Sequence, residues 1–391
     1  MPVVLVCAVS SANAQSGSSN DDGPSTPTTE KDEPPPAPAQ AADTKPDGFT
    51  MGVFVFKPGG RMKLDIIRDF SAITSEDSFD PRTIAVDGSD GANSQLHAKE
   101  TRLFIDVRGP VENKELRMYV ETDFYGSSSV LRLRHAYGSW GGLLAGQTWS
   151  TFVDDANFPN TIDFESPMAF PSIRQAQLRW TAKLTDKASW SVAVEDNKST
   201  ITPPPVPGKP EYVMPDFVGR IRFDGPRLHS FVAGFLGKAR FRPATGDVDD
   251  VTLWGSVLSE KLKTVGKDSL YGQFTFGDGV GRYRGAVTAV PDASGHLHAP
   301  KIYAGMAGYE HYWTPVFSSN GVYSIASQPD EDFYPPDGNS QLNYGALNLL
   351  YWFLPDRAWA GVEYLYGRRE VFSGDSGTAH RIQFAVRFNL P

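Results

Sequence analysis

The 391-residue chain has a single cysteine, Cys7, no excess of basic residues, and no apolar run of about 18 residues. One cysteine cannot form a disulfide framework or a cysteine-ligated zinc or iron–sulfur site. The formal charge of −9, without a basic stripe, argues against nucleic-acid binding. The missing apolar run excludes a transmembrane α-helix. It leaves open a transmembrane β-barrel, because barrel strands alternate and need no such run.

The first fifty residues are typical of an exported protein. An apolar run from Val3 to Val9 precedes Ala12-Asn13-Ala14, a small-x-small pattern that signal peptidase cuts, so we expect residues 1–14 to be a signal peptide. A start inside a longer signal peptide would explain its missing basic segment. Residues 15–50 are rich in proline, serine, threonine and acid, which predicts a disordered periplasmic tether. Residues 51–391 remain for one folded domain.

Alternation of apolar and polar side chains dominates the folded domain. It runs through residues 102–108, 116–125 and 381–390, and several segments alternate for about ten residues, the length of a tilted strand that spans a bilayer. Aromatic residues gather near the ends of these segments, as in an interfacial girdle. The pattern predicts an all-β fold, a transmembrane antiparallel β-barrel of about 16 strands. A water-soluble sandwich, which also alternates, is the alternative.

Short and long connections alternate along the same domain, as they do at the two ends of an outer-membrane barrel. We expect tight turns at Gly109-Pro110 and at residues 138–142, 185–187, 225–226, 313–315 and 354–356. We expect longer loops at residues 74–96, 149–172, 197–215, 278–300 and 328–340. Both termini then lie on the side of the short turns.

Arginines occupy the polar positions of the alternating segments. Because arginine near the middle of the lipid face costs about 2–4 kcal/mol, we expect these side chains to line the lumen. The predicted pore-lining residues are Arg102, Arg117, Arg132, Arg134, Arg174, Arg179, Arg220, Arg222 and Arg381. For any single one of them, an ordinary lumen charge paired with a nearby acid is the alternative.

The loop from Ser150 to Pro171 carries the opposite charge. It is long, rich in aromatic and other apolar residues, and contains four acids: Asp154, Asp155, Asp163 and Glu165. Long loops with packing residues are often functional. We expect this third loop to fold into the barrel and set its carboxylates against the arginines, which would make a filter of charged side chains. An external lid or a contact between subunits is the alternative.

These residues also carry a family resemblance. The run from Arg132 to Ser150 (RLRHAYGSWGGLLAGQTWS), continuing through residues 158–165 to 173–175, resembles the DcaP-like outer-membrane porins of Gram-negative bacteria. Residues 59–65 resemble the first strand of that family, and the resemblance is sharpest at Gly146-Gln147-Thr148-Trp149. It implies a sixteen-stranded homotrimeric channel for passive diffusion of small solutes, with a preference for anions such as dicarboxylates. The chain departs from the family in lacking a coiled-coil segment and a terminal Phe.

No constellation points to an enzyme. His296-x-His298 lies in a Gly/Pro-rich loop without a further obvious ligand, and no Gly-x-Ser-x-Gly elbow occurs. We therefore expect no catalytic residue, no metal and no cofactor. The expected partners are small anionic solutes, outer-membrane lipids, the outer-membrane assembly machinery and further copies of the chain, but no nucleic acid. A non-channel outer-membrane barrel with a plugged lumen and a structural or adhesion role is the alternative function.

Overall fold

The computed structural model describes residues 48–126, 129–197, 201 and 207–390. The expected signal peptide and all but the last three residues of the expected tether lie outside these ranges. The first strand, β1 (Phe49–Met51), begins two residues before the expected start of the barrel domain and pairs with the following strand.

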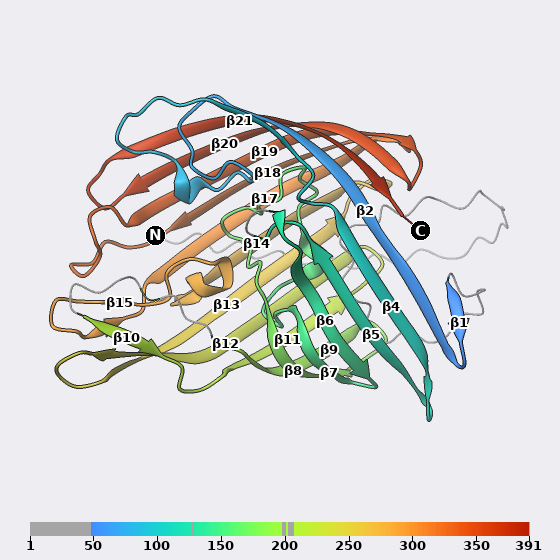
Figure 1. Cartoon of the computed structure of the whole chain (residues 1–391), viewed down its shortest axis with the longest axis horizontal. Coiled ribbons are helices and arrows are strands. Elements are labelled where there is room, and N and C mark those ends of the chain that lie inside the picture. Colours follow the sequence, from blue (N-terminus) through green and yellow to red (C-terminus); the bar gives the residue numbers. More distant parts are fainter. Residues whose placement is uncertain (1–47, 127–128, 198–200, 202–206, 391) are drawn as a thin grey trace, which may run out of the picture.

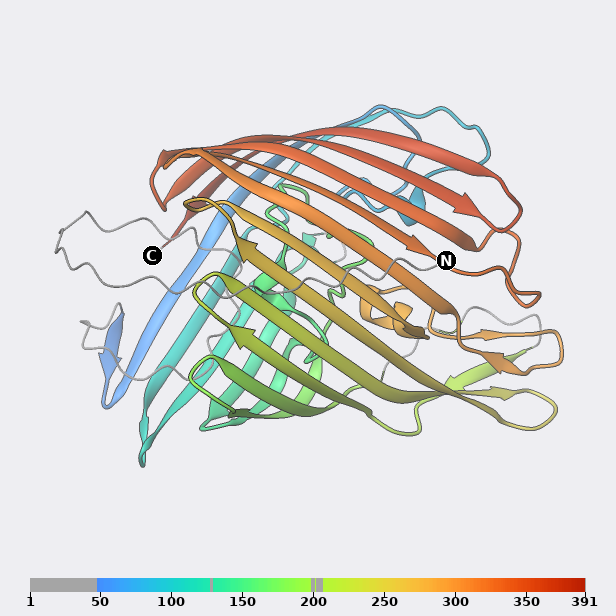
Figure 2. The same cartoon turned by 180° about the vertical axis from the view of Figure 1, so that it is seen from behind.

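Within the described ranges, sixteen strands form one closed antiparallel barrel, which confirms the predicted fold (Figures 1 and 2). They are β2 (Phe54–Asp69), β4 (Arg102–Val111), β5 (Lys114–Asp123), β6 (Arg132–Trp140), β7 (Leu143–Trp149), β8 (Arg174–Lys183), β9 (Ala188–Glu195), β11 (Asp216–Asp224), β12 (Leu228–Pro243), β13 (Asp249–Lys263), β14 (Ser269–Asp278), β17 (Lys301–Thr314), β18 (Phe317–Ser327), β19 (Asn339–Leu354), β20 (Ala358–Val371) and β21 (Ser376–Asn389). The first and last of them close the barrel, pairing from Arg61 with Asn389 to Asp69 with Arg381. Closure leaves the main barrel without an open edge.

The remaining strands are short additions. β3 (Asn93–His97) pairs with the end of β2, β10 (Gly208–Glu211) pairs with β12, and β15 (Val290–Pro291) pairs with β16 (Leu297–His298). The helical elements in the described ranges are three 3₁₀ turns, η1 (Pro81–Thr83), η3 (Asp155–Asn157) and η4 (Val280–Arg284). No helix in this part of the chain is long and apolar enough to cross a membrane.

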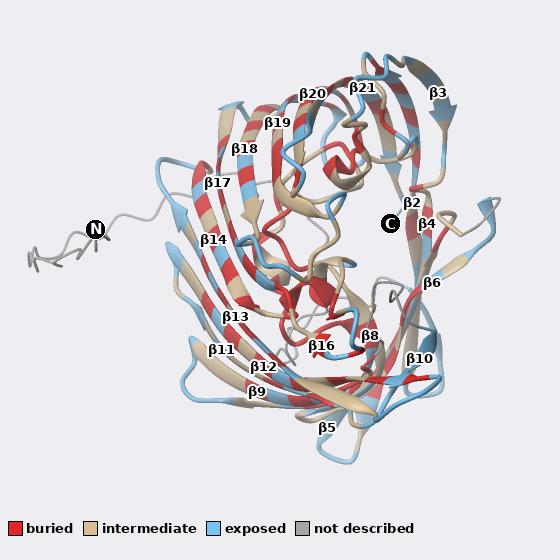
Figure 3. Cartoon of the chain, turned by 90° about the vertical axis from the view of Figure 1, so that its left-hand side faces the viewer, coloured by how far each residue is buried: buried red, intermediate tan, exposed pale blue. Residues whose placement is uncertain are grey.

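Side-chain exposure alternates along the strands as the sequence predicts (Figure 3). On β21, Ile382 and Phe384 are exposed on the outer face, whereas Arg381 and Gln383 are buried inside. The same alternation places Leu103 outside and Arg102 inside on β4. Lipid-facing apolar residues and inward polar residues therefore share each strand, which is the pattern of a membrane barrel.

The turns and loops follow the expected alternation, with corrections at four turns. Residues 138–140 belong to β6 and Leu354 to β19. Gly109 and Pro110 lie inside β4, and the turn comes at Glu112-Asn113, where Glu112 has a φ of 55°. A proline near a strand end removes only one possible ladder bond, so the strand continues past it. Trp313 and Thr314 likewise belong to β17, and the turn there is residues 315–316.

Three loops of the described chain fold into the lumen instead of one. We name them L1 (residues 70–101), L3 (residues 150–173) and L6 (residues 279–300). Phe79 of L1, Phe152 of L3 and Tyr283 of L6 are almost fully buried in one apolar cluster with the inner wall. The sequence predicts the inward fold of L3, but the inward folds of L1 and L6 were not predicted.

Candidate functional site

The first half of L3 (residues 150–157) is fixed to the wall formed by β9, β12, β13 and β14. The Glu195 carboxylate accepts hydrogen bonds from Ser150 Oγ at 2.6 Å and from the Thr151 backbone N–H at 2.7 Å. Asp154 Oδ2 accepts from Ser259 Oγ at 2.6 Å, and Asp154 also lies 3.0 Å from His229 Nε2. Because Asp154 is fully buried, these partners are what make its charge tolerable there.

The second half of L3 (residues 158–166) crosses the lumen to the opposite wall. Its backbone is held by wall side chains: the Glu363 carboxylate accepts the N–H groups of Ile162 at 2.9 Å and Asp163 at 2.7 Å. Lys63 Nζ donates to the Ile162 carbonyl at 2.5 Å. Asn348 Nδ2 donates to the Asn160 carbonyl at 2.7 Å. Main-chain groups bonded to charged partners give stronger hydrogen bonds than neutral pairs, so this segment has a defined position.

Glycines on β20 make room for the loops. A Cβ on Gly361 would lie 2.8 Å from the side chain of Ile162 in L3, and one on Gly367 would lie 2.8 Å from Phe79 in L1. Such distances are shorter than ordinary van der Waals contacts. Both loops therefore reach the barrel wall at positions where the wall has no side chain, and Gly361 determines how close L3 can come to β20.

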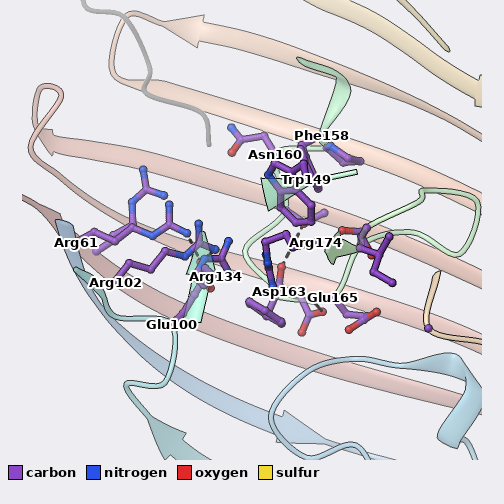
Figure 4. Close-up of a pocket in the computed structure, with 18 of the residues that line it drawn as sticks. Arg61, Glu100, Arg102, Arg134, Trp149, Phe158, Asn160, Asp163, Glu165 and Arg174 are labelled. Atoms are coloured by element: carbon purple, nitrogen blue, oxygen red, sulfur yellow. Dashed lines mark hydrogen bonds and ion pairs between the residues drawn. The ribbon is translucent and has the colours of Figure 1, made fainter. Parts of the chain in front are cut away.

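A cavity of about 340 Å³ lies between the second half of L3 and the wall (Figure 4). Eight arginines line it: Arg61, Arg82, Arg102, Arg132, Arg134, Arg174, Arg284 and Arg387. Three carboxylates line it: Glu100, Asp163 and Glu165. Five aromatic residues complete the lining: Trp149, Phe158, Phe164, Trp352 and Trp359. Arg61, Arg102 and Arg134 gather on one side around Glu100, and Arg174 lies beneath Trp149 (Figure 4).

Four of the nine predicted arginines line this cavity, and three of them are partnered by acids of the wall or of L1. Arg132 forms two hydrogen bonds with Asp123, of 2.9 and 2.6 Å. Arg134 lies 2.5 Å from Glu121 and 3.0 Å from Asp123. Arg102 Nη2 lies 3.6 Å from Glu100. These pairs hold the guanidinium groups against the wall with their charge largely balanced.

Arg174 differs from the other three. Its guanidinium lies 4.5 Å from the centre of the Trp149 ring, a cation–π contact. No hydrogen bond or ion pair joins it to any other described residue. The Trp149 ring therefore supports this cation without neutralising it, and the charge remains available to a solute.

The other five predicted arginines do not line this cavity. Arg117 forms two hydrogen bonds of 2.8 Å with Asp106, and Arg222 lies 2.9 Å from Asp155 and 2.8 Å from Asp224. Arg381 is buried against Asp69 at 2.6 Å. The last two, Arg179 and Arg220, lie inward on β8 and β11, and Arg220 Nε donates to Ser191 Oγ at 3.2 Å.

The four predicted acids divide between the two halves of L3. Asp154 and Asp155 are docked on the wall, away from the cavity, whereas Asp163 and Glu165 line it. Asp163 accepts two hydrogen bonds from the Phe79 N–H of L1, of 3.0 and 3.1 Å, and lies 3.6 Å from Arg381. Burial raises the pKa of Asp163 to about 8, with Glu363 and Glu165 adding to the shift and Arg381 opposing it.

Glu100, between β3 and β4, is an acid that sequence reasoning did not select. Burial raises the pKa of its carboxyl, but Lys63, Arg61 and Arg102 outweigh that effect and lower it to about 2. Its charge is therefore fixed at physiological pH, and it organises three cations at one side of the cavity.

Arg82 of L1 and Arg284 of L6 were also missed. Side chains of loop residues do not alternate between two faces as those of a strand do, so the sequence does not indicate that these two arginines point into the cavity. Trp352 and Trp359 were missed for a different reason. Tyr351, Trp352 and Phe353 are among the aromatic residues near strand ends that we expected in an interfacial girdle. Strand alternation instead turns Trp352 inward, between the exposed Tyr351 and Phe353.

A closed antiparallel barrel of sixteen strands, with apolar residues outside and a charged cavity beside an inward third loop, is the architecture of a porin-type outer-membrane barrel. A family model described as DcaP outer membrane protein matches residues 54–390. The chain belongs to this family and is a protein of the Gram-negative outer membrane. A comparison with curated protein sequences gave no match.

Solved structures with the same fold include three informative examples. The outer membrane channel DcaP of Acinetobacter baumannii has a TM-score of 0.79 and 22% identity, covering 88% of this chain and 99% of that one. An anion-selective porin from Comamonas acidovorans has a TM-score of 0.59 and 11% identity, covering 86% and 99%. The trimer form of OmpT from Vibrio cholerae has a TM-score of 0.57 and 11% identity, covering 86% and 100%. At these identities the likeness is one of fold.

Proposed function

We propose that this protein is a water-filled channel for passive diffusion of small hydrophilic solutes, and that it favours anions such as mono- and dicarboxylates. The observation that carries the proposal is the lining of the cavity, where arginines outnumber carboxylates and Arg174 has no ion-pair partner among the described residues. Unit charges about 4 Å apart interact by about 4 kcal/mol at an effective dielectric of about 20. Salt screens charges over about 8 Å at physiological ionic strength, so a charged solute that passes L3 would interact electrostatically with the side chains that line the cavity.

Arg174 supports a channel over a plugged structural or adhesion barrel. A plugged barrel would pair or bury its interior polar groups, because an unpaired buried charge is costly. The Arg174 guanidinium instead lies in the cavity with an aromatic ring as its contact. The chemistry that suits such a cation is a carboxylate or another small anion.

Planar-bilayer recording in a salt gradient tests the proposal. We expect stepwise insertion of channels and a reversal potential of the sign for anion preference. The double variant Arg132→Ala/Arg134→Ala should reduce that preference, because it removes two positive charges and leaves Asp123 and Glu121 without these partners. Absence of conductance steps would contradict the channel. A cation-type reversal potential, or unchanged selectivity in the double variant, would contradict only the role of the arginines.

We also propose that the barrel is a homotrimer whose subunits meet through the wall of short strands, β4–β9. Of the described residues on these strands, Trp180 is the one exposed aromatic, whereas exposed aromatic residues recur along β11–β21. Aromatic residues mark the boundary with lipid, so β11–β21 suits contact with outer-membrane lipids and β4–β9 suits contact with protein. Barrels of this kind also need the outer-membrane assembly machinery. Mass measurement of the detergent-solubilised protein tests the trimer, and a monomer would contradict it.

A further inference from the structure

Three loops meet around one carboxylate at the loop end of the cavity. Glu165 of L3 forms a close ion pair with Arg284 of L6, and Arg82 of L1 lies 3.8 Å from the same oxygen, Oε1. The two arginines are themselves joined, because Arg82 Nη1 donates to the Arg284 carbonyl at 2.9 Å. A carboxylate between two guanidinium groups is the arrangement by which proteins bind carboxylate ligands.

The acids at this point differ in how firmly they are held. Asp80 accepts the Arg82 side chain through both of its oxygens, at 2.7 to 3.0 Å, and also accepts the Arg82 backbone N–H at 3.0 Å. Among the described residues, the Glu165 carboxylate meets Arg82 and Arg284 through Oε1, and it accepts no backbone N–H as Asp80 does. Asp80 is therefore part of the framework, whereas Glu165 can leave its partners by side-chain rotation without breaking any backbone contact of its own.

Arg284 would remain in place if Glu165 moved away. Its guanidinium donates to the Ser166 carbonyl at 2.5 Å and to Ser172 Oγ at 3.2 Å. Its Nε is buried and has no hydrogen-bond acceptor among the described residues. The arginine is thus positioned by L3 backbone and side-chain oxygens that carry no charge, and it has a donor to spare for an anion.

The two arginines lie toward the loop end of the barrel. Arg82 and Arg284 line the main cavity and also a second, smaller cavity of about 60 Å³. The smaller cavity is lined by Gln328, Asn339 and Gln341, at the loop ends of β18 and β19. A solute arriving from the loop side through it would meet Arg82 and Arg284 before Arg174.

We propose that Arg82 and Arg284 form the outermost anion-binding site of the channel, and that the chain's own Glu165 carboxylate occupies it until a solute carboxylate displaces it. This rests on the proposed function, because it assumes an anion-conducting pore. With Glu165 bound, Arg82, Arg284, Asp80 and Glu165 balance in charge. With Glu165 displaced, the solute carboxylate takes its place beside the two arginines. The Glu165 carboxylate then stays in the lumen without these partners, which opposes binding and favours release of the solute.

The conductance of single channels in increasing potassium acetate tests this inference, since acetate reproduces the Glu165 carboxylate. The half-saturating concentration gives the apparent affinity, which is weakened by the fraction of time that Glu165 occupies the site. If that occupancy is between about two-thirds and nine-tenths, Glu165→Gln lowers the half-saturating concentration by about three- to tenfold. Asp155→Asn, on the same loop but paired with Arg222 away from the cavity, is the matched control and should leave it unchanged.

A double-mutant cycle separates competition for the arginines from loosening of the loop. Arg284→Gln should weaken acetate binding, and in that background Glu165→Gln should lose most of its effect. The inference is overturned if Glu165→Gln leaves acetate affinity unchanged or weaker, or if its full effect persists without Arg284. Failure of the proposed function is recognised separately, because wild-type channels would then lack anion preference in the salt gradient. Heat-modifiable migration on gels verifies that each variant is folded.

Discussion

The two halves of L3 carry two acids each but place them in different surroundings. In residues 150–157, Asp154 and Asp155 each pair with a residue of the barrel wall, and neither lines the cavity. In residues 158–166, Asp163 and Glu165 face the cavity and its arginines. The number of acidic residues in a loop therefore does not by itself determine the electrostatic potential in the pore. What matters is which carboxylates the backbone carries to the opposite wall.

The largest effect should follow from releasing the second half from that wall. Glu363→Ala removes the acceptor of the Ile162 and Asp163 N–H groups, and each buried N–H left unsatisfied costs about 1–3 kcal/mol. We expect residues 158–166 to leave the wall, so that single-channel conductance changes and current noise rises. The measurement is single-channel recording at fixed salt.

Glu370→Gln is the control for this variant. Glu370 lies on the same strand, β20, where it pairs with Arg368 at 3.1 Å and contacts no part of L3 in the described hydrogen-bond network. The single-channel conductance of Glu370→Gln should equal that of the wild-type protein. A quiet Glu363→Ala channel with wild-type conductance would show that the backbone bonds to Glu363 do not position the loop.

The next largest effect should come from Arg174, the cation that faces the second half of L3. Arg174→Gln removes a charge that forms no ion pair with any acid in the described part of the chain, so the reversal potential in a salt gradient should move toward zero. The matched variant is Arg220→Gln, which removes an inward arginine of β11 that does not line the cavity. Equal shifts in the two variants would contradict a special role for the cavity.

A third effect should appear on titration. Below about pH 8 Asp163 is mainly protonated, and above it the cavity gains a negative charge, so anion preference should fall as the pH rises through that value. The raised pKa also means that the folded protein binds more protons than the unfolded chain from about pH 4 to about pH 8, so stability contributed by this group falls over that range. Reversal potentials at about pH 6 and about pH 9 check the first consequence. In Asp163→Asn this pH dependence should disappear, and its persistence would assign the titration to another group.

Much of this architecture follows from the order of residues. Side chains alternate strictly along a strand, and lipid excludes arginine, so the inward positions of Arg102, Arg134 and Arg174 could be derived from the sequence. The inward fold of L3 was also predictable, because its apolar residues would be poorly solvated outside. Position on a strand gives the direction of a side chain but not its neighbours, so the pairing of Arg117 with Asp106 was not foreseen.

The rest of the site depends on contacts between distant loops. Arg82 and Arg284 are 202 residues apart and meet only because L1 and L6 both fold inward. Neither loop has a regular alternation of apolar and polar residues, so the sequence does not show which way the side chains of Arg82 and Arg284 point. Gly361 and Gly367 admit Ile162 and Phe79 to the wall, but a glycine in a strand indicates a close approach without identifying what approaches.

The smallest effect should come from the first half of L3. Asp155→Asn removes one negative charge from the loop, as Asp163→Asn does at high pH, but the Asp155 partner is Arg222, which does not line the cavity and keeps a second partner in Asp224. Because the lost charge lies away from the cavity, we expect the reversal potential to stay at the wild-type value. Salt-gradient recordings of Asp155→Asn and Asp163→Asn at about pH 9, side by side, make the measurement. If the two variants shift selectivity equally, the net charge of L3 governs the pore and the distinction between its halves fails.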